Sequence, residues 1–148
     1  LDDFSGGACA AQLLLRDAPA NPQFAILSGP QNDARSSRRV AGFQSVTNAK
    51  AIAARGWFFD DGYEAAMRVL DCARDGVFCC NDRLAEAVVC FCRNAHQKPP
   101  RIVGFDDAPV AEKLGISTIA IPWREMTESA TTIIARRLTG DCSTASQI

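Results

Sequence analysis

The chain alternates short apolar runs with longer amphipathic stretches. Short, mainly apolar runs that end at polar or turn-forming residues predict strands buried inside a sheet. We expect such strands at 24–27, 77–80, 101–105 and 117–121, with a shorter and ambiguous one inside 52–59 that ends near Trp57.

The stretches between these runs carry apolar residues at helical spacing. Tyr63, Ala66, Met67 and Leu70 form one such stripe. The polar stretch 31–39 is interpreted as a functional loop. The expected helices lie at 6–15, 38–49, around 63–70, around 84–91, at 110–114 before Gly115, and around 126–138 before Gly140.

Strands that alternate with helices are typical of an α/β fold with a doubly wound parallel sheet. The first helix precedes the first strand and is a candidate member of a neighbouring lobe. We interpret residues 1–140 as one domain fragment and residues 141–148 as a flexible tail. The missing initiator methionine suggests that a piece of the protein lies upstream.

Composition narrows the function classes. Of 148 residues, 47% are hydrophobic, the formal net charge is −1, and no stretch is densely basic. A segment that held a phosphate backbone would carry a basic patch, so we expect no nucleic acid on this part of the chain. No apolar stretch is long enough for a membrane span, and the first residues, Leu1-Asp2-Asp3, do not have the basic and apolar pattern of a secretion signal.

Seven cysteines occur, and none shows the C-x-x-C spacing of a zinc site. Cys79 and Cys80 are neighbours in a strand, where successive side chains point to opposite faces. We therefore expect reduced, buried cysteines, no metal, no cofactor and a cytoplasmic location.

Polar residues follow each apolar run. In a parallel sheet, ligands bind beyond the carboxyl ends of the strands, which selects Ser28 to Arg39, the segment around Trp57, Asn81-Asp82 and Asp106-Asp107. Carboxylates, an amide, a guanidinium and an indole together suit the hydroxyl groups and C–H face of a sugar.

Each of these residues also has a structural interpretation. Asn81 or Asp82 could cap the next helix, and Asp106 or Asp107 could form a turn. Arg39 could be a solvated helix residue, and Trp57 a core aromatic. The functional interpretation depends on all of them meeting at one edge of the sheet.

An enzyme is disfavoured. The sequence holds no G-x-S-x-G elbow, phosphate-binding loop or dinucleotide fingerprint. The single histidine, His96, is expected at the surface, and adjacent acidic pairs such as Asp60-Asp61 usually mark turns.

Four short motifs follow one another along nearly the whole chain. They are Asp2-Asp3-Phe4-Ser5-Gly6-Gly7, Arg39-Val40-Ala41-Gly42-Phe43, Asn81-Asp82-Arg83-Leu84-Ala85 and Val103-Gly104-Phe105-Asp106-Asp107. In this order they resemble the motifs of the LacI/GalR repressors, and the segment Ser117 to Pro122 with the helix after it resembles that family's next strand and helix.

The resemblance implies a lobe of a type I periplasmic-binding-protein-like core, mainly the second lobe with its crossing segments. The DNA-binding head and most of the first lobe would lie outside this chain. It also implies a homodimer packed through helices 61–73, 84–92 and the short one near Val110. The positions implied to face a small effector are Asp2, Arg39, Trp57, Asn81 and Asp106.

Together these observations predict the effector-binding and dimerisation part of a ligand-responsive transcription regulator. The effector would be a sugar or a similar small polar molecule, and DNA would be bound only through the absent head. The alternative is a sugar-binding receptor of a transport system, which the seven cysteines disfavour. A helix-turn-helix upstream would support the regulator, and a signal peptide the receptor.

Overall fold

A parallel sheet of five strands, ordered β2-β1-β3-β4-β5, forms the centre of the computed structural model, which describes residues 2–139. All four strand pairs are parallel, so the predicted α/β class and parallel sheet are confirmed. The strands are β1 (Phe24–Ser28), β2 (Ala49–Ala53), β3 (Gly76–Cys79), β4 (Arg101–Asp106) and β5 (Ser117–Ala120).

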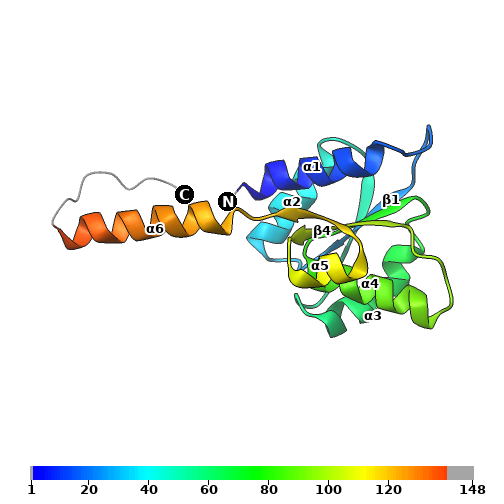
Figure 1. The fold of residues 1–148 in the computed structure, drawn as a ribbon. Helices are drawn as coiled ribbons and strands as arrows, with labels where there is room; N and C mark the ends of the chain where they lie inside the picture. The colour runs from blue at the N-terminus through cyan, green and yellow to red at the C-terminus, as the bar shows by residue number, and fades with distance from the viewer. Residues whose placement is uncertain (1, 140–148) are drawn as a thin grey trace.

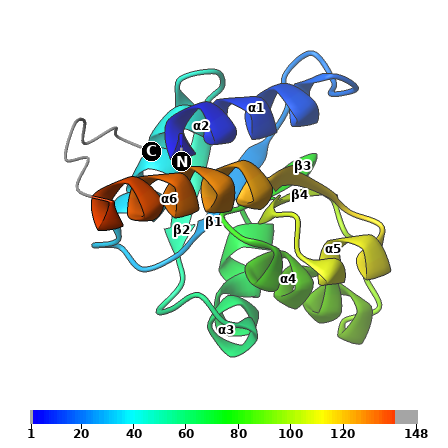
Figure 2. The same ribbon diagram turned by 60° about the vertical axis from the view of Figure 1, so that its left-hand side comes forward.

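Helices cover both faces of the sheet (Figures 1 and 2). The helices are α1 (Asp3–Leu15), α2 (Ala34–Gln44), α3 (Phe59–Leu70), α4 (Asp82–Asn94), α5 (Pro109–Leu114) and α6 (Trp123–Leu138). Helices α1 and α2 lie on one face and α3, α4 and α5 on the other, while α6 extends away from the body.

A hydrophobic core lies on each face of the sheet. Successive residues of each central strand pack into opposite cores, because side chains alternate across a sheet. Ala25 and Leu27 pack under α3 and α4, whereas Phe24 and Ile26 pack under α1 and α2. Cys79 and Cys80 divide in the same way, and both are fully buried, as expected. All six cysteines within residues 2–139 are free thiols.

The predicted neighbouring-lobe helix is wrong: α1 belongs to this domain. Ala10, Ala11 and Leu14 are fully buried in the core under α1 and α2. The two helices approach closely at Gly42, where a Cβ atom would lie 1.9 Å from the carbonyl oxygen of Phe4. Only a residue without a side chain fits this crossing.

The predicted helix 38–49 is also wrong at both ends. Asp33 caps α2 by accepting from the amide of Ser36 at 2.8 Å, so helix begins inside the stretch interpreted as a loop. The helix ends at Gln44, and Ala49 already begins β2. The strand expected near Trp57 therefore lies earlier, at the edge of the sheet, where Lys50 is exposed and the apolar run is short.

The stripe predicted for α3 is displaced. Met67 is 58% exposed, and the buried face of the helix is formed by Gly62, Ala65, Ala66 and Val69. Small residues allow α3 to lie close to α4, so the largest side chains of this helix were a misleading guide to its inner face.

The last helix is confirmed but makes little contact with the body. None of the α6 residues is buried, and only Met126, near its start, packs against the core. The predicted end at Gly140 and the predicted tail at 141–148 lie outside the described residues. Within residues 2–139, no helix is long and apolar enough to cross a membrane.

Candidate ligand-binding site

A cavity of about 330 Å³ opens at the carboxyl ends of the strands, where the fold rule places ligands. Its volume lies within the range typical of small-molecule sites, about 300–1,000 Å³. Four of the five predicted site residues meet here. The residues that line the cavity are Asp33, Arg35, Arg39, Trp57, Asn81 and Asp106.

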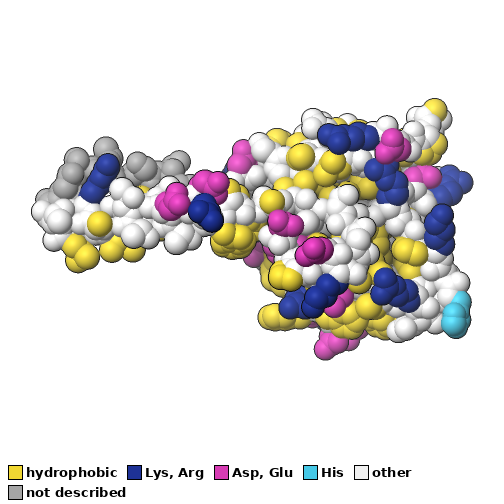
Figure 3. Space-filling view, viewed as in Figure 1, with side chains coloured by type: hydrophobic (Ala, Val, Ile, Leu, Met, Phe, Trp, Pro, Cys, Tyr) yellow, Lys and Arg dark blue, Asp and Glu magenta, His cyan; other side chains and the backbone are white. Residues whose placement is uncertain are grey.

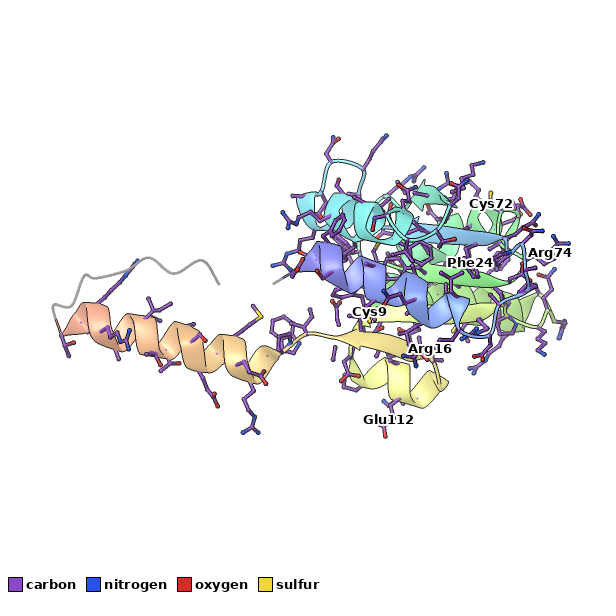
Figure 4. All side chains as sticks on the ribbon, turned by 90° about the horizontal axis from the view of Figure 1, so that it is seen from above. Cys9, Arg16, Phe24, Cys72, Arg74 and Glu112 are labelled. Atoms are coloured by element: carbon purple, nitrogen blue, oxygen red, sulfur yellow. The ribbon has the colours of Figure 1, made fainter. Side chains whose placement is uncertain are left out.

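A larger cavity of about 490 Å³ lies at the opposite end of the sheet, beside Leu14, Arg74 and Pro99-Pro100. Figure 4 shows Arg74 and Phe24 at this end, away from α6. Amino ends of parallel strands are not the usual place for a ligand. We therefore assign the site to the smaller cavity.

Arg39 is the most tightly held residue of the site. Its side chain is buried, and its Nε donates to Oδ1 of Asp3 over 2.7 Å. Its Nη1 donates to the carbonyl oxygen of Cys80 at 2.5 Å and to Oδ1 of Asp106 at 3.3 Å. The guanidinium carbon also lies 3.6 Å from the ring centroid of Phe105. The solvated-helix interpretation of Arg39 is therefore wrong.

Asp106 ends β4 and lines the cavity with a side chain that is one-third exposed. Burial raises the pKa of its carboxyl above the ordinary value, although the positive charge of Arg39 opposes the shift. Its backbone has a φ of 105° and that of Asp107 a φ of 55°, both in the region that side chains usually avoid. Asp106 and Asp107 therefore form a turn, one of the two interpretations offered by the sequence, and Asp106 also lines the cavity.

Trp57 lies in the loop after β2 and is half-buried against both cores. Its indole covers Gly29, where a Cβ atom would lie 2.5 Å from ring atoms. The core and ligand interpretations of Trp57 thus both apply: one part of the indole packs inward, and the side chain also lines the cavity.

Asn81 is buried and caps α4, since its Oδ1 accepts from the amide of Leu84 at 2.8 Å. Its Nδ2 donates to the carbonyl oxygen of Trp57 at 3.0 Å. Asn81 therefore fixes the Trp57 loop against the start of α4 while lining the cavity. Its capping role, one of the two alternatives from the sequence, is present.

Asp2 lies apart from the other four. It is exposed and caps α1, with Oδ1 accepting from the amide of Ser5 at 3.0 Å and Oδ2 from its hydroxyl at 2.6 Å. These bonds lower the pKa of its carboxyl. The neighbour that reaches the site is Asp3, through Arg39.

Sequence reasoning missed Asp3, and it included Asp33 and Arg35 only within the stretch Ser28 to Arg39, without singling them out. Asp3 shares the buried face of α1 with Gly7 and Ala10, so its position on the apolar stripe was the signal. Asp33 stands three residues before Ser36, the spacing of a helix cap. Nothing in the pattern separates Arg35 from a solvated residue. Among residues 2–139, no group of histidine, cysteine or acidic side chains could hold a metal.

The family model described as periplasmic binding protein-like domain matches residues 22–148. No curated protein matches the sequence at a significant level. Solved structures of LacI-family transcriptional regulators share the fold. One from Burkholderia phymatum has a TM-score of 0.81 and 22% identity, and the match covers 99% of this chain and 57% of that one.

Two similar structures hold ribose. The regulator from Enterococcus faecium has a TM-score of 0.84 and 24% identity over 97% of this chain and 57% of its own. That from Enterococcus faecalis has a TM-score of 0.80 and 26% identity over 91% and 52%. The chain thus spans little more than half the length of these relatives.

Proposed function

Because the chain belongs to the periplasmic binding protein-like domain family and has the fold of LacI-family regulators, we propose that it is the effector-binding part of a ligand-responsive transcription regulator. The effector is a sugar. The observation that carries the proposal is the cavity in which Asp106, Arg39 and Trp57 meet at the carboxyl ends of the strands.

These side chains offer complementary contacts to a sugar. The Asp106 carboxylate accepts from hydroxyl groups, the Arg39 guanidinium donates, and the Trp57 indole packs on ring C–H groups. Asn81 lines the same wall. Asp2, on the exposed N-terminus of α1, is retained as a proposed contact at the rim.

The charges of the cavity favour a neutral effector. Two arginines and two aspartates line it, so their formal charges cancel, and Arg39 is already paired with Asp106 and with Asp3 behind it. A phosphorylated sugar would find no unmatched positive charge at the inner wall. Ribose, which two similar structures contain, is the first compound to test.

We further propose that residues 1–140 form one wall of a cleft whose other wall belongs to the remaining half of the protein. A bound effector changes the arrangement of the two walls only as far as it binds one arrangement better than the other. DNA is bound by a separate head. The chain is not an enzyme, and the protein acts in the cytoplasm with reduced cysteines.

Homodimerisation is proposed through α3, α4 and α5, which lie side by side on one face of the sheet (Figure 1). Phe58, just before α3, is 76% exposed and Met67 is 58% exposed on this layer. Figure 3 shows yellow hydrophobic side chains along this lower part of the body. Exposed apolar side chains that gather in this way are typical of an interface.

The test of the effector site is thermal stability of the full-length protein. Ribose is expected to raise the melting temperature, since a ligand that binds only the folded state stabilises it. Asp106→Ala is expected to abolish the rise, whereas Asp17→Ala is the matched control, because the Asp17 side chain is 83% exposed and lies at the opposite end of the sheet. No rise with ribose or a broad panel of sugars would contradict the proposed function.

A further inference from the structure

Asp82 is a buried carboxylate that the site described above does not use. It directly follows Asn81 in the chain, but its side chain is turned inward and its residue is only 1% exposed. It is the first residue of α4. Its two carboxylate oxygens accept hydrogen bonds from Ala108 and Thr118, and neither of these residues lines the cavity.

Two hydrogen bonds to this carboxylate, and a third accepted by one of its partners, connect it to the loop after β4. Oδ2 accepts from the amide of Ala108 at 2.7 Å. Oδ1 accepts from the hydroxyl of Thr118, on β5, at 2.7 Å. The same Thr118 oxygen accepts from the amide of Asp107 at 3.2 Å. Asp82 therefore holds two consecutive amides of the loop, one directly and one through Thr118.

The held segment is the one that presents Asp106 to the cavity. Asp106 and Asp107 have φ values of 105° and 55°. Side chains adopt such conformations only where the surroundings fix them. Both amide anchors follow Asp106 immediately, so they act on this strained part of the chain.

The neighbouring strand leaves room for the carboxylate. A Cβ atom at Gly104 would lie 2.0 Å from Oδ1 of Asp82, which is closer than any real contact. The glycine of β4 thus allows the charged group to lie against the strand. Burial raises the pKa of the Asp82 carboxyl, whereas its bonds to Thr118 and Ala108 lower it.

A buried carboxylate is costly unless donors satisfy it, and an apolar side chain would fill the same space without that cost. Packing alone therefore does not account for an acidic residue at position 82. The hydrogen bonds by which it holds the loop after β4 do account for it.

We propose that Asp82, acting with Thr118, is the positioning residue for Asp106. It holds the left-handed turn after β4 so that the Asp106 carboxylate is aimed into the cavity before the effector arrives. This inference rests on the proposed function for the part that concerns effector binding, and on the hydrogen bonds alone for the part that concerns the loop.

The test compares Thr118→Val with Thr118→Ser in the full-length protein. Valine keeps the branched shape and removes the hydroxyl, whereas serine keeps the hydroxyl and removes the methyl group. These changes are milder than Asp82→Ala. That substitution would leave a cavity and would remove the acceptor of two buried donors, the amide of Ala108 and the hydroxyl of Thr118. Two quantities are measured: hydrogen exchange of the Asp107 and Ala108 amides without ligand, and the affinity for ribose.

For Thr118→Val we expect exchange at these amides to become about tenfold faster and ribose affinity to fall about tenfold, since a bond to a charged group is lost. Thr118→Ser is expected to remain near wild type in both. Unchanged exchange in the valine variant would overturn the proposal. So would a serine variant as impaired as the valine one, because packing would then be the cause.

The two proposals can fail separately. If the valine variant loosens the loop but binds ribose as tightly as wild type, Asp82 does not position Asp106 and the inference is overturned. If wild-type protein binds no ribose, the effector assigned above is contradicted, and the exchange comparison still decides whether Asp82 holds the loop.

Discussion

Nε of Arg39 donates to Oδ1 of Asp3 over 2.7 Å, and the two side chains are only 3% and 8% exposed. This pair joins α2 to α1 behind the cavity wall. The same guanidinium reaches Asp106 on the cavity side, so its orientation is fixed from both ends.

Loss of Asp3 is expected to destabilise the fold strongly. Asp3→Ala leaves Arg39 buried without the nearer of its two carboxylate partners, and breaking such a pair typically costs about 3 kcal/mol or more. Asp2→Ala is the matched control for stability, because the exposed neighbour caps α1 and its loss costs about 1 kcal/mol. Urea unfolding of both variants gives the two free energies, and equal losses would contradict a special role for the buried pair.

Gly29→Ala is expected to displace the indole of Trp57, since the added Cβ would lie 2.5 Å from the ring. Overpacking of this kind costs enough to weaken ribose binding by about tenfold. The displacement is measured by tryptophan fluorescence in a Trp123→Phe background, which removes the other indole. A spectrum and affinity unchanged by the alanine would show that Trp57 does not depend on Gly29.

Ribose affinity is expected to fall on acidification at a higher pH than an ordinary aspartate would allow. The pKa of Asp106 is raised above 3.8, so its acceptor is lost as the pH falls through that raised value. Stability moves the other way: the folded state takes up this proton before the unfolded chain does. Asp106 therefore stabilises the fold at low pH, and that contribution is lost as the pH rises through the raised pKa.

Calorimetric titration across this pH range checks the prediction. Asp106→Asn is the control, because it cannot ionise and its weaker affinity should not change over the same range. A wild-type profile that falls only at or below pH 3.8 would contradict the raised pKa.

The thiols are expected to differ sharply in reactivity towards a disulfide reagent. Cys9 is exposed on α1 and reacts quickly (Figure 4). Cys79 and Cys80 are fully buried, and burial raises the pKa of Cys80 to about 12, so neither supplies a thiolate in the folded state. Mass spectrometry of the modified peptides measures this. Cys9→Ser should remove one fast equivalent, and fast labelling of Cys80 would contradict the buried core.

Dimer formation is expected to fail when a charge is placed on the exposed apolar surface of α3, α4 and α5. Phe58→Glu puts a carboxylate at a 76% exposed position of the proposed interface. Val46→Glu, at a 38% exposed position after α2, is the control. Sedimentation of the full-length protein gives the oligomeric state. A dimer that survives Phe58→Glu but not Val46→Glu would place the interface elsewhere.

Two of the strands that the sequence predicts well are buried on both faces. Phe24 to Leu27 and Val77 to Cys80 are continuous apolar runs, because helices cover them from two sides. The edge strand β2 was predicted too late in the chain, because one side of it meets solvent and Lys50 interrupts its apolar pattern.

The strand-end rule selects the segments that contain Arg39, Trp57, Asn81 and Asp106, and the family resemblance implies these residues within them. All four line the same cavity. The rule does not show how these side chains are held. Asp3 stands in the sequence within an acidic pair, and Asp82 stands beside Asn81 as a candidate helix cap. Each is held in its buried position by a partner 36 residues away, and the local sequence does not identify that partner.

Helix α6 buries none of its 16 residues. Isolated helices of this length are only marginally stable in water, so its order depends on whatever covers it. Three of its threonine hydroxyls, on Thr127, Thr131 and Thr132, donate to carbonyl oxygens of the preceding turn, and such bonds do not stabilise a helix. The helical fraction of α6 therefore reports on whether the helix is covered. Any change in the surface that packs on α6 will raise or lower this fraction.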